Sequence, residues 1–216
     1  DTEQLEASLT AIAEAAIDSV FGLARADMVR RYGEIDAEIS IVALGRLGVK
    51  QLTAGSDLDL LIIYDAALDV FSNGERKLPA ASYVLRLAQT MISWISTPTA
   101  EGTLYDVDLR LRPEGQAGAV ATSIARLATY FDRDAWIWEK QALTKARPIA
   151  GDAGISDKIQ QLININVNHN HPKDSLVKAI SDMRQRIQKR QKPASQWHLR
   201  QIAGGLTDID LLIQAW

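Results

Sequence analysis

The chain has 216 residues, enough for one large domain or two small ones, and its 47% hydrophobic content is typical of a folded globular protein. Its 24 basic and 27 acidic residues leave a net charge of −3, which argues against a dedicated nucleic-acid-binding protein. The absence of cysteine excludes disulfides and thiolate sites, and we see neither a secretory signal nor an apolar run of the roughly 18–20 residues that a membrane span needs.

The first third of the chain predicts one long helix and two strands. Apolar residues at helical spacing indicate an amphipathic helix over residues 2–31. A run rich in β-branched residues predicts a strand over 39–44 that ends at Gly45, and a short helix is expected over 48–52. Residues 58–64 are almost wholly apolar, as in a strand that is covered on both faces.

The rest of the chain predicts one more strand and several helices. Strict alternation of residue types over 103–111 indicates a third strand with one charged face. Helices are expected over residues 79–96, 123–131, 135–145, 174–191 and 209–216. The sequence therefore predicts an α/β (α+β) fold, divided into residues 1–115, which hold a long helix and the strands, and a helical lobe over 116–216.

The two ends of the chain add one expectation. The chain begins at Asp1 instead of a methionine, and it stops at Trp216, inside its last predicted helix. We therefore expect a piece of a longer polypeptide, with the helical lobe truncated at its C-terminal end.

Aspartates stand one residue apart on the second and third predicted strands. Residues i and i+2 of a strand point to the same side, so Asp57 and Asp59 should converge. Converging carboxylates repel one another unless a cation lies between them, and a divalent metal is the usual solution. Asp106 and Asp108 share a face of the third strand, and one of them would complete a three-carboxylate cluster that can hold two Mg²⁺ ions. A solvated acidic strand end is the plainer alternative.

A glycine turn precedes the first acidic pair. Gly45 and Gly48 enclose two residues directly after the first strand, and glycine lets backbone N–H groups approach a phosphate. The turn and the carboxylates together suggest metal-assisted transfer of a nucleotide. The alternative role of the glycines is simply to end the strand.

The same segments resemble the signature of the glutamine synthetase adenylyltransferases, a family of the DNA polymerase β-like nucleotidyltransferase superfamily. The resemblance begins in Ala-Leu-Gly-Arg-Leu-Gly at 43–48 and Ser-Asp-Leu-Asp-Leu at 56–60. Three further blocks follow in the order of the family, over residues 104–113, 135–148 and 204–210. The resemblance implies a polymerase β-like nucleotidyltransferase core, and the stretches 53–57 and 118–123 look more like the family's C-terminal, adenylylating domain than its N-terminal copy.

The resemblance also implies roles for individual residues. Catalysis and the binding of Mg²⁺, with two ions expected, fall to Asp57, Asp59 and Asp108, the last favoured over Asp106 by the family motif. Nucleotide or phosphate binding falls to Gly45, Gly48, Ser56, Arg110, Lys145 and Arg147. Ser56 could instead cap the turn, Arg110 could pair with Asp106 or a helix carboxylate, and Lys145 or Arg147 could form a salt bridge on a helix surface. Of Trp136 and Trp138, one should be in the core and the other at a contact with the lobe, with adenine stacking as a further alternative.

The implied function is transfer of AMP from ATP to a tyrosine of glutamine synthetase, which controls nitrogen assimilation. Two alternatives stay open. One is the deadenylylating copy of the same enzyme, which uses phosphate and releases ADP, and the other is a regulatory module that binds ATP without turnover. The resemblance implies glutamine synthetase as the protein substrate, with a PII-type signal protein and glutamine as regulators of the full-length enzyme. We expect a cytoplasmic protein without a nucleic-acid or membrane partner.

Overall fold

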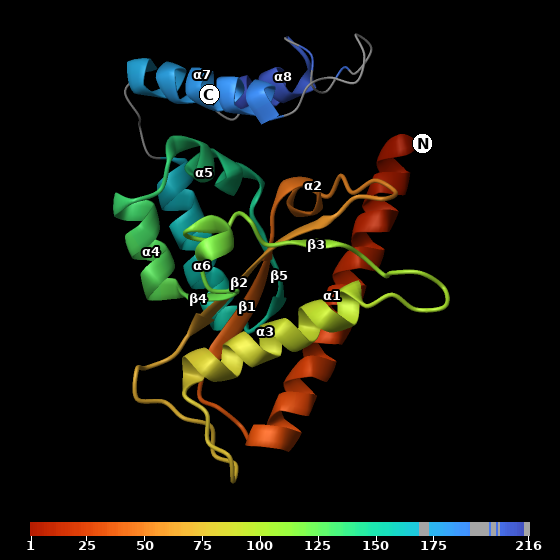
Figure 1. Cartoon of the computed structure of the whole chain (residues 1–216), viewed down its shortest axis with the longest axis vertical. Helices are drawn as coiled ribbons and strands as arrows, with labels where there is room; N and C mark the ends of the chain where they lie inside the picture. Colours follow the sequence, from red (N-terminus) through yellow and green to blue (C-terminus); the bar gives the residue numbers. More distant parts are fainter. Residues whose placement is uncertain (169–172, 191–198, 200–201, 203, 214–216) are drawn as a thin grey trace.

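The computed structural model describes residues 1–168, 173–190, 199, 202 and 204–213 (Figure 1). A five-stranded sheet lies at its centre, with the order β3-β2-β1-β5 and with β4 also paired to β2. The strands are β1 (Glu38–Ala43), β2 (Leu58–Asp65), β3 (Val107–Asp108), β4 (Ala121–Ser123) and β5 (Arg147–Gly151). Strand β1 runs antiparallel to β2 and β5, whereas β2 runs parallel to β3 and β4.

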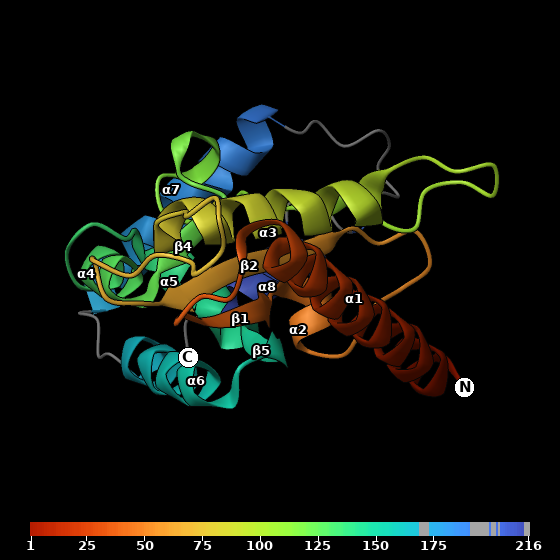
Figure 2. The ribbon, with the colours of Figure 1, turned by 90° about the horizontal axis from the view of Figure 1, so that it is seen from below.

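The two central strands are buried on both faces, which explains their almost continuous apolar sequence. Alternate residues enter two separate cores, as the two-residue period of a strand requires. One core contains Ile41 and Ile62 together with residues of α1 (Thr2–Tyr32) and α3 (Ala80–Ser96). The other contains Val42 and Leu61 together with residues of α4 (Ile124–Arg133) and α6 (Ala153–Val167). Figure 2 shows the resulting layers, with α1 and α3 on one side of the sheet and α6 on the other.

Helix α1 differs from the sequence analysis in one respect. It has the length and composition of a membrane span, with a mean hydropathy of 1.4 over an 18-residue window, of which 28% is buried. Ile17, Phe21 and Met28 place one face of the helix in the core against α3 and the sheet. This composition therefore suits a core helix as well as a membrane-spanning one.

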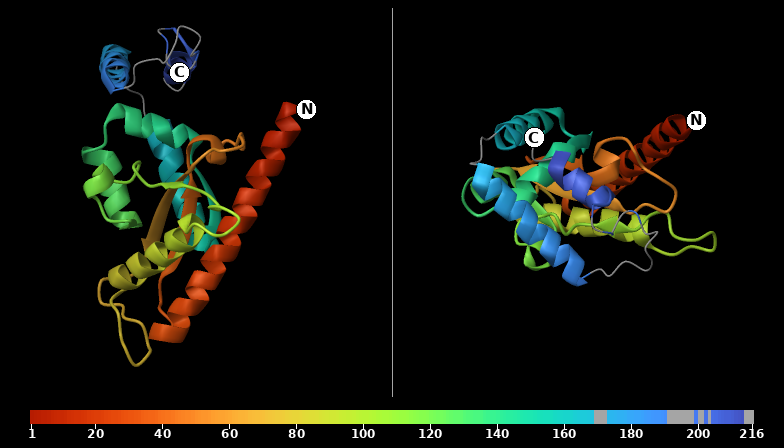
Figure 3. Two further views of the ribbon diagram at one scale, coloured as in Figure 1. Left: turned by 45° about the vertical axis from the view of Figure 1, so that its right-hand side comes forward. Right: turned by 90° about the horizontal axis from the view of Figure 1, so that it is seen from above.

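The remaining helices gather at one end of the sheet. Helix α2 (Gly45–Gly48) follows β1, and α5 (Ile137–Ala142) continues into the 3₁₀ turn η2 (Leu143–Lys145); a second 3₁₀ turn, η1, covers Gly115–Ala117. Helices α7 (Lys173–Arg190) and α8 (Leu206–Ile213) pack on each other, and α7 also packs on α5. Figures 1 and 3 show α7 and α8 as a separate layer above α5 and α2.

The α/β (α+β) class and the long N-terminal helix are confirmed, and the helices predicted over 123–131, 135–145 and 174–191 correspond to α4, to α5 with η2, and to α7. Helix α6 was not predicted, and residue 191 and residues 214–216 of the last predicted helix lie outside the described residues. The third strand is much shorter than the predicted 103–111, because the Asp108 carboxylate accepts the backbone N–H of Arg110 and turns the chain away from β2. The short helix begins at Gly45 instead of residue 48. Strands β4 and β5 were not predicted, so the sheet also receives strands from the region that was expected to be helical.

Candidate active site

The acidic cluster forms where β2 begins beside β3. Parallel pairing places Asp59 opposite Asp108, and the N–H of Leu58 donates to the carbonyl oxygen of Asp106 at 2.8 Å. One carboxylate oxygen from each of Asp57, Asp59 and Asp108 lies within 4.8 Å of the others. We call these three residues the acidic cluster. Among the described residues it does not include Asp106, although that residue lines the same pocket.

The donor set of the acidic cluster fits a divalent cation. Carboxylate oxygens are the ligands that Mg²⁺ prefers, and three converging anions without a cation would repel one another. Asp57 is exposed, while Asp59 and Asp108 are half-buried. The cluster is therefore open to solvent on one side and anchored in the sheet on the other. The predicted metal ligands do lie together.

Arg110 supplies positive charge to the cluster. Its backbone N–H donates to Asp108 Oδ1 at 2.8 Å, and its Nε and Nη2 donate to Asp108 Oδ2, the former at 2.7 Å. The guanidinium holds the pKa of the Asp108 carboxyl below its usual range, and Asp108, Asp57 and Asp59 raise the pKa of Arg110. Arg110 therefore pairs with a cluster residue and not with Asp106, the partner considered from the sequence.

A pocket of about 450 Å³ opens beside the cluster. Its wall contains residues of β3 and the turn after it, together with one cluster residue from the start of β2. The lining residues are Asp57, Asp106, Val107, Asp108, Leu109, Arg110 and Arg112. The pocket thus combines carboxylates that can hold a metal with guanidinium groups that can face a phosphate.

The glycine turn, Gly45–Gly48, lies directly against the cluster. Leu44, just before it, donates its N–H to the carbonyl oxygen of Asp59 at 2.9 Å. Gly45 has a φ of +54°, and a Cβ at this position would overlap Asp59 Oδ2. Only glycine satisfies both conditions without displacing the carboxylate. Gly45 therefore allows the turn to pack directly against the Asp59 carboxylate of the acidic cluster.

Gly48 makes a packing contact, and its predicted role in phosphate binding stays a prediction. A Cβ at Gly48 would overlap the carbonyl oxygen of Lys145, so this glycine allows α2 to pack directly on η2. Arg147 fastens the same contact: its Nε donates to the Gly48 carbonyl at 3.1 Å and its Nη2 to the Leu47 carbonyl at 3.2 Å. Arg147 also forms an ion pair with Glu14 of α1. The structure thus engages the Arg147 guanidinium in holding the turn.

Ser56 and Lys145 make contacts that agree with their plainer alternatives. Ser56 Oγ accepts the N–H of Thr53 at 3.3 Å and lies 2.9 Å from Thr53 Oγ1, so it closes the loop before the acidic pair. Lys145 Nζ lies 3.5 Å from Asp210 Oδ1 of α8. Neither residue contacts the acidic cluster through these groups, and phosphate binding by either one stays a prediction.

Arg46 was not among the site residues predicted from the sequence. Its guanidinium projects from the glycine turn and donates to Thr53 Oγ1 and, at 3.4 Å, to Ser56 Oγ. It is an exposed cation beside the loop that carries Asp57. The signal was available, since a basic residue between two glycines of a phosphate-type turn is itself a phosphate-binding candidate.

The chain is similar to known proteins along most of its length. The family model described as glutamate-ammonia ligase adenylyltransferase matches residues 1–162. A Brucella suis biovar 1 protein is 39% identical over 207 residues, covering 94% of this chain and 21% of the relative. Relatives from Bradyrhizobium sp. strain BTAi1 and Rhodopseudomonas palustris strain TIE-1 are 37% and 38% identical, covering 98% and 99% of this chain and 22% of each relative.

All three relatives carry the name bifunctional glutamine synthetase adenylyltransferase/adenylyl-removing enzyme. The chain spans about a fifth of the length of these relatives. The match of the family model to most of the chain, together with the level of identity, shows that the chain belongs to the glutamate-ammonia ligase adenylyltransferase family.

Proposed function

We propose that this chain is a nucleotidyl-transfer domain that moves AMP from ATP to a tyrosine of glutamine synthetase. The observation that carries the proposal is the acidic cluster, in which two strands and a glycine turn bring three carboxylate oxygens within 4.8 Å of one another. The names of the relatives supply the chemical class of the reaction and the protein that accepts the nucleotide. The tyrosine target and the metal-assisted mechanism are our inference.

Asp57, Asp59 and Asp108 would hold two Mg²⁺ ions, for which the converging oxygens are suitable ligands. When bound, Mg²⁺ supplies positive charge to the triphosphate and lowers the pKa of an attacking hydroxyl. Gly45 leaves room for the Asp59 carboxylate to keep its position beside the turn. Arg110 faces the pocket and provides a guanidinium for phosphate oxygens.

A tyrosine hydroxyl, with a pKa of about 10, has to lose its proton during the transfer. Arg110 lowers the pKa of the Asp108 carboxyl, which keeps Asp108 ionised but makes it a weaker base. Asp108 would therefore accept the proton of a tyrosine hydroxyl whose own pKa a bound Mg²⁺ has lowered. The tyrosine oxygen forms a bond to the α-phosphorus as the bond to the bridging oxygen breaks in line with it. Pyrophosphate leaves with the electron pair of the broken bond.

The test uses ATP labelled on the α-phosphate, Mg²⁺ and unmodified glutamine synthetase from the same organism. We expect label on a tyrosine of the synthetase and loss of that label with Asp57→Asn. Asp106→Asn is the matched control, because its carboxylate lies outside the acidic cluster but in the same pocket, and it should keep most of the activity. Transfer that survives Asp57→Asn would overturn the assignment of the metal ligands.

The relatives' name also includes adenylyl removal, which favours one alternative. In that case the domain would release ADP from adenylylated glutamine synthetase, and the release would depend on inorganic phosphate. ATP binding without either product would instead indicate a regulatory module. Control of a longer enzyme by a PII-type signal protein and by glutamine, and a cytoplasmic location, are further proposals from the family resemblance.

A further inference from the structure

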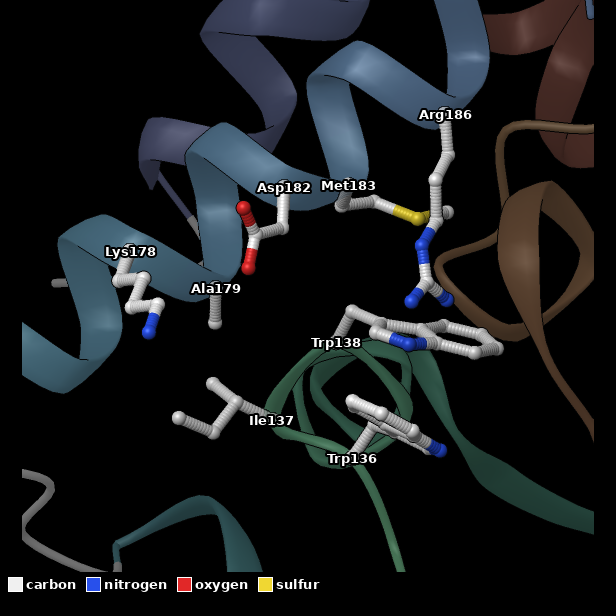
Figure 4. A pocket seen from close by; sticks show the side chains of 8 residues that line it. All are labelled: Trp136, Ile137, Trp138, Lys178, Ala179, Asp182, Met183 and Arg186. Atoms are coloured by element: carbon white, nitrogen blue, oxygen red, sulfur yellow. The ribbon is translucent and has the colours of Figure 1, made fainter.

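A second pocket lies away from the acidic cluster, between α5 and α7. It has a volume of about 250 Å³. Trp136, Ile137 and Trp138 line it from the α5 side, and Asp182, Met183 and Arg186 line it from α7. Figure 4 shows both indole rings and the Arg186 guanidinium converging on one side, with Asp182 on α7 facing the cavity. We call this cavity the α5–α7 pocket.

The indole N–H of Trp138, a residue that lines the pocket, has no hydrogen-bond acceptor among the described residues. The Nε1 atom itself is buried. A buried indole N–H normally finds a partner, because an unpaired buried donor destabilises the fold. Trp138 lines the pocket while its N–H is shielded from solvent, so an acceptor bound in the pocket can reach this donor only after a small side-chain movement.

The buried carboxylate of Glu139 holds the start of α5, which carries the tryptophans of the pocket. The Glu139 carboxylate accepts the backbone N–H of Trp136 at 2.8 Å, and it accepts the Tyr130 hydroxyl at 2.7 Å. Glu139 is 9% exposed, so both bonds lie in a shielded environment. In contrast, the Trp136 ring is 58% exposed and the Arg186 guanidinium lies 5.2 Å from its centre. The backbone at Trp136 is therefore held in place, although its indole ring does not pack into the hydrophobic core.

We propose that the α5–α7 pocket binds the adenine base of a nucleotide. A planar purine stacks on an indole face, a ring nitrogen accepts the Trp138 N–H, and the exocyclic amine donates to the Asp182 carboxylate. The Arg186 guanidinium, which lies 5.2 Å from the centre of the Trp136 ring, can contact the edge of the stacked base. The proposal deepens the proposed function and rests on it in one respect, because adenine is the base of the ATP that the domain would use.

The fold connects this pocket to the glycine turn. Helix α5 continues directly into η2, whose last residue, Lys145, touches Gly48 through its carbonyl oxygen. Lys145 Nζ also lies 3.5 Å from Asp210 of α8, which packs on α7. One continuous segment therefore carries the two indoles at its start and contacts the glycine turn at its end. The adenine could belong to the substrate ATP or to a separately bound adenine nucleotide.

The experiment measures binding by calorimetry with the whole chain. The probes are adenosine, a non-hydrolysable α,β-methylene ATP with Mg²⁺, and tripolyphosphate with Mg²⁺. Trp138→Phe keeps an aromatic ring and removes the N–H, and Asp182→Asn removes the carboxylate. We expect each variant to weaken adenosine and the ATP analogue about five- to tenfold and to leave tripolyphosphate unchanged. Trp94→Phe is the matched control, because Trp94 is an exposed tryptophan on α3, outside this pocket.

The possible outcomes test the pocket assignment and the proposed function independently. Competition between adenosine and the ATP analogue supports the base of the substrate, whereas simultaneous binding, with only adenosine weakened by the variants, supports a second adenine nucleotide. Adenosine binding that depends on Trp138, without any binding of the ATP analogue, supports the pocket and contradicts the proposed function. A wild-type chain that does not bind adenosine, or folded Trp138→Phe and Asp182→Asn variants that bind it like the wild type, would overturn the pocket assignment.

Discussion

The two sides of the candidate active site are built by different forces. The acidic cluster is a concentration of like charge that Arg110 balances in part, and Asp57 is open to solvent. The glycine turn opposite it is a packed contact, in which Gly48 meets η2 and Arg147 binds two carbonyls of the turn. The difference shows that the fold preorganises the turn, whereas the cluster concentrates negative charge that a bound cation would offset.

The largest expected effect separates activity from stability at the charged side. Asp57→Asn should reduce adenylyl transfer at least about a thousandfold, because it removes a proposed metal ligand. Its urea unfolding midpoint should stay the same or rise, since one of three converging charges is removed. Transfer of labelled AMP and urea unfolding on the same preparation check both. If Asp57→Asn lowered stability as well as activity, the acidic cluster would contribute to folding, and the two sides would not differ in the way described.

A second prediction addresses the packed side. Gly48→Ala should destabilise the fold by about 2–4 kcal/mol, because the added methyl group overlaps the Lys145 carbonyl. Gly22→Ala is the matched control: an added Cβ meets nothing within 4 Å there, and the change should stabilise the helix by about 0.5–1 kcal/mol. Denaturant unfolding of the two variants provides the measurement. Equal midpoints would show that α2 can move away from η2.

The third prediction concerns the support of α5. Tyr130→Phe removes the hydroxyl that donates to the buried Glu139 carboxylate and should cost about 1–2 kcal/mol of folding stability. Burial, and then the bond to Glu139, raises the pKa of Tyr130. Because the folded pKa exceeds the unfolded one, this contribution is complete below about pH 10 and is lost as pH rises through the folded pKa.

Unfolding of wild type and Tyr130→Phe in parallel from neutral to alkaline pH checks the sign. The difference in stability should be constant at neutral pH and shrink at the alkaline end. A difference that grew with pH would show that the folded environment favours the phenolate.

The smallest expected effect is on metal affinity. Arg110→Gln removes the cation that pairs with Asp108, so Mn²⁺ should bind the nucleotide-free domain about three- to tenfold more tightly. Electron paramagnetic resonance of free Mn²⁺ measures this directly. Asp27 of α1 pairs with Arg30 and Arg31 away from the cluster, so Arg30→Gln is the control and should leave Mn²⁺ binding unchanged. Unchanged affinity in Arg110→Gln would mean that the guanidinium does not compete with the cation.

The sequence predicted the charged side well because its signals are local. Period-two spacing placed Asp57 and Asp59 on one side of the chain, and the alternation of the third strand placed Asp108 nearby. The structure brings all three together. It was the family motif, and not the spacing, that favoured Asp108 over Asp106.

The packing of the glycine turn on η2 was not predicted, because it depends on residues that are far apart in the sequence. Arg147 holds the turn through Gly48 and Glu14, which are 99 and 133 residues away in sequence. Strand β4 has three residues and β5 contains a proline and a glycine, so neither shows the alternation of an ordinary strand. Their pairing with β2 and β1 is set by tertiary contacts that composition does not reveal.

The bond between Arg110 and Asp108 has a consequence for the order in which ligands arrive. The guanidinium already binds the Asp108 carboxylate, so Arg110 and a cation bound to the same carboxylate would each weaken the binding of the other. Thermodynamic linkage makes this reciprocal: a polyphosphate that draws Arg110 away raises cation affinity by the same factor by which the cation raises polyphosphate affinity. We therefore expect the domain to take up nucleotide and metal together more readily than it takes up metal alone in the acidic cluster.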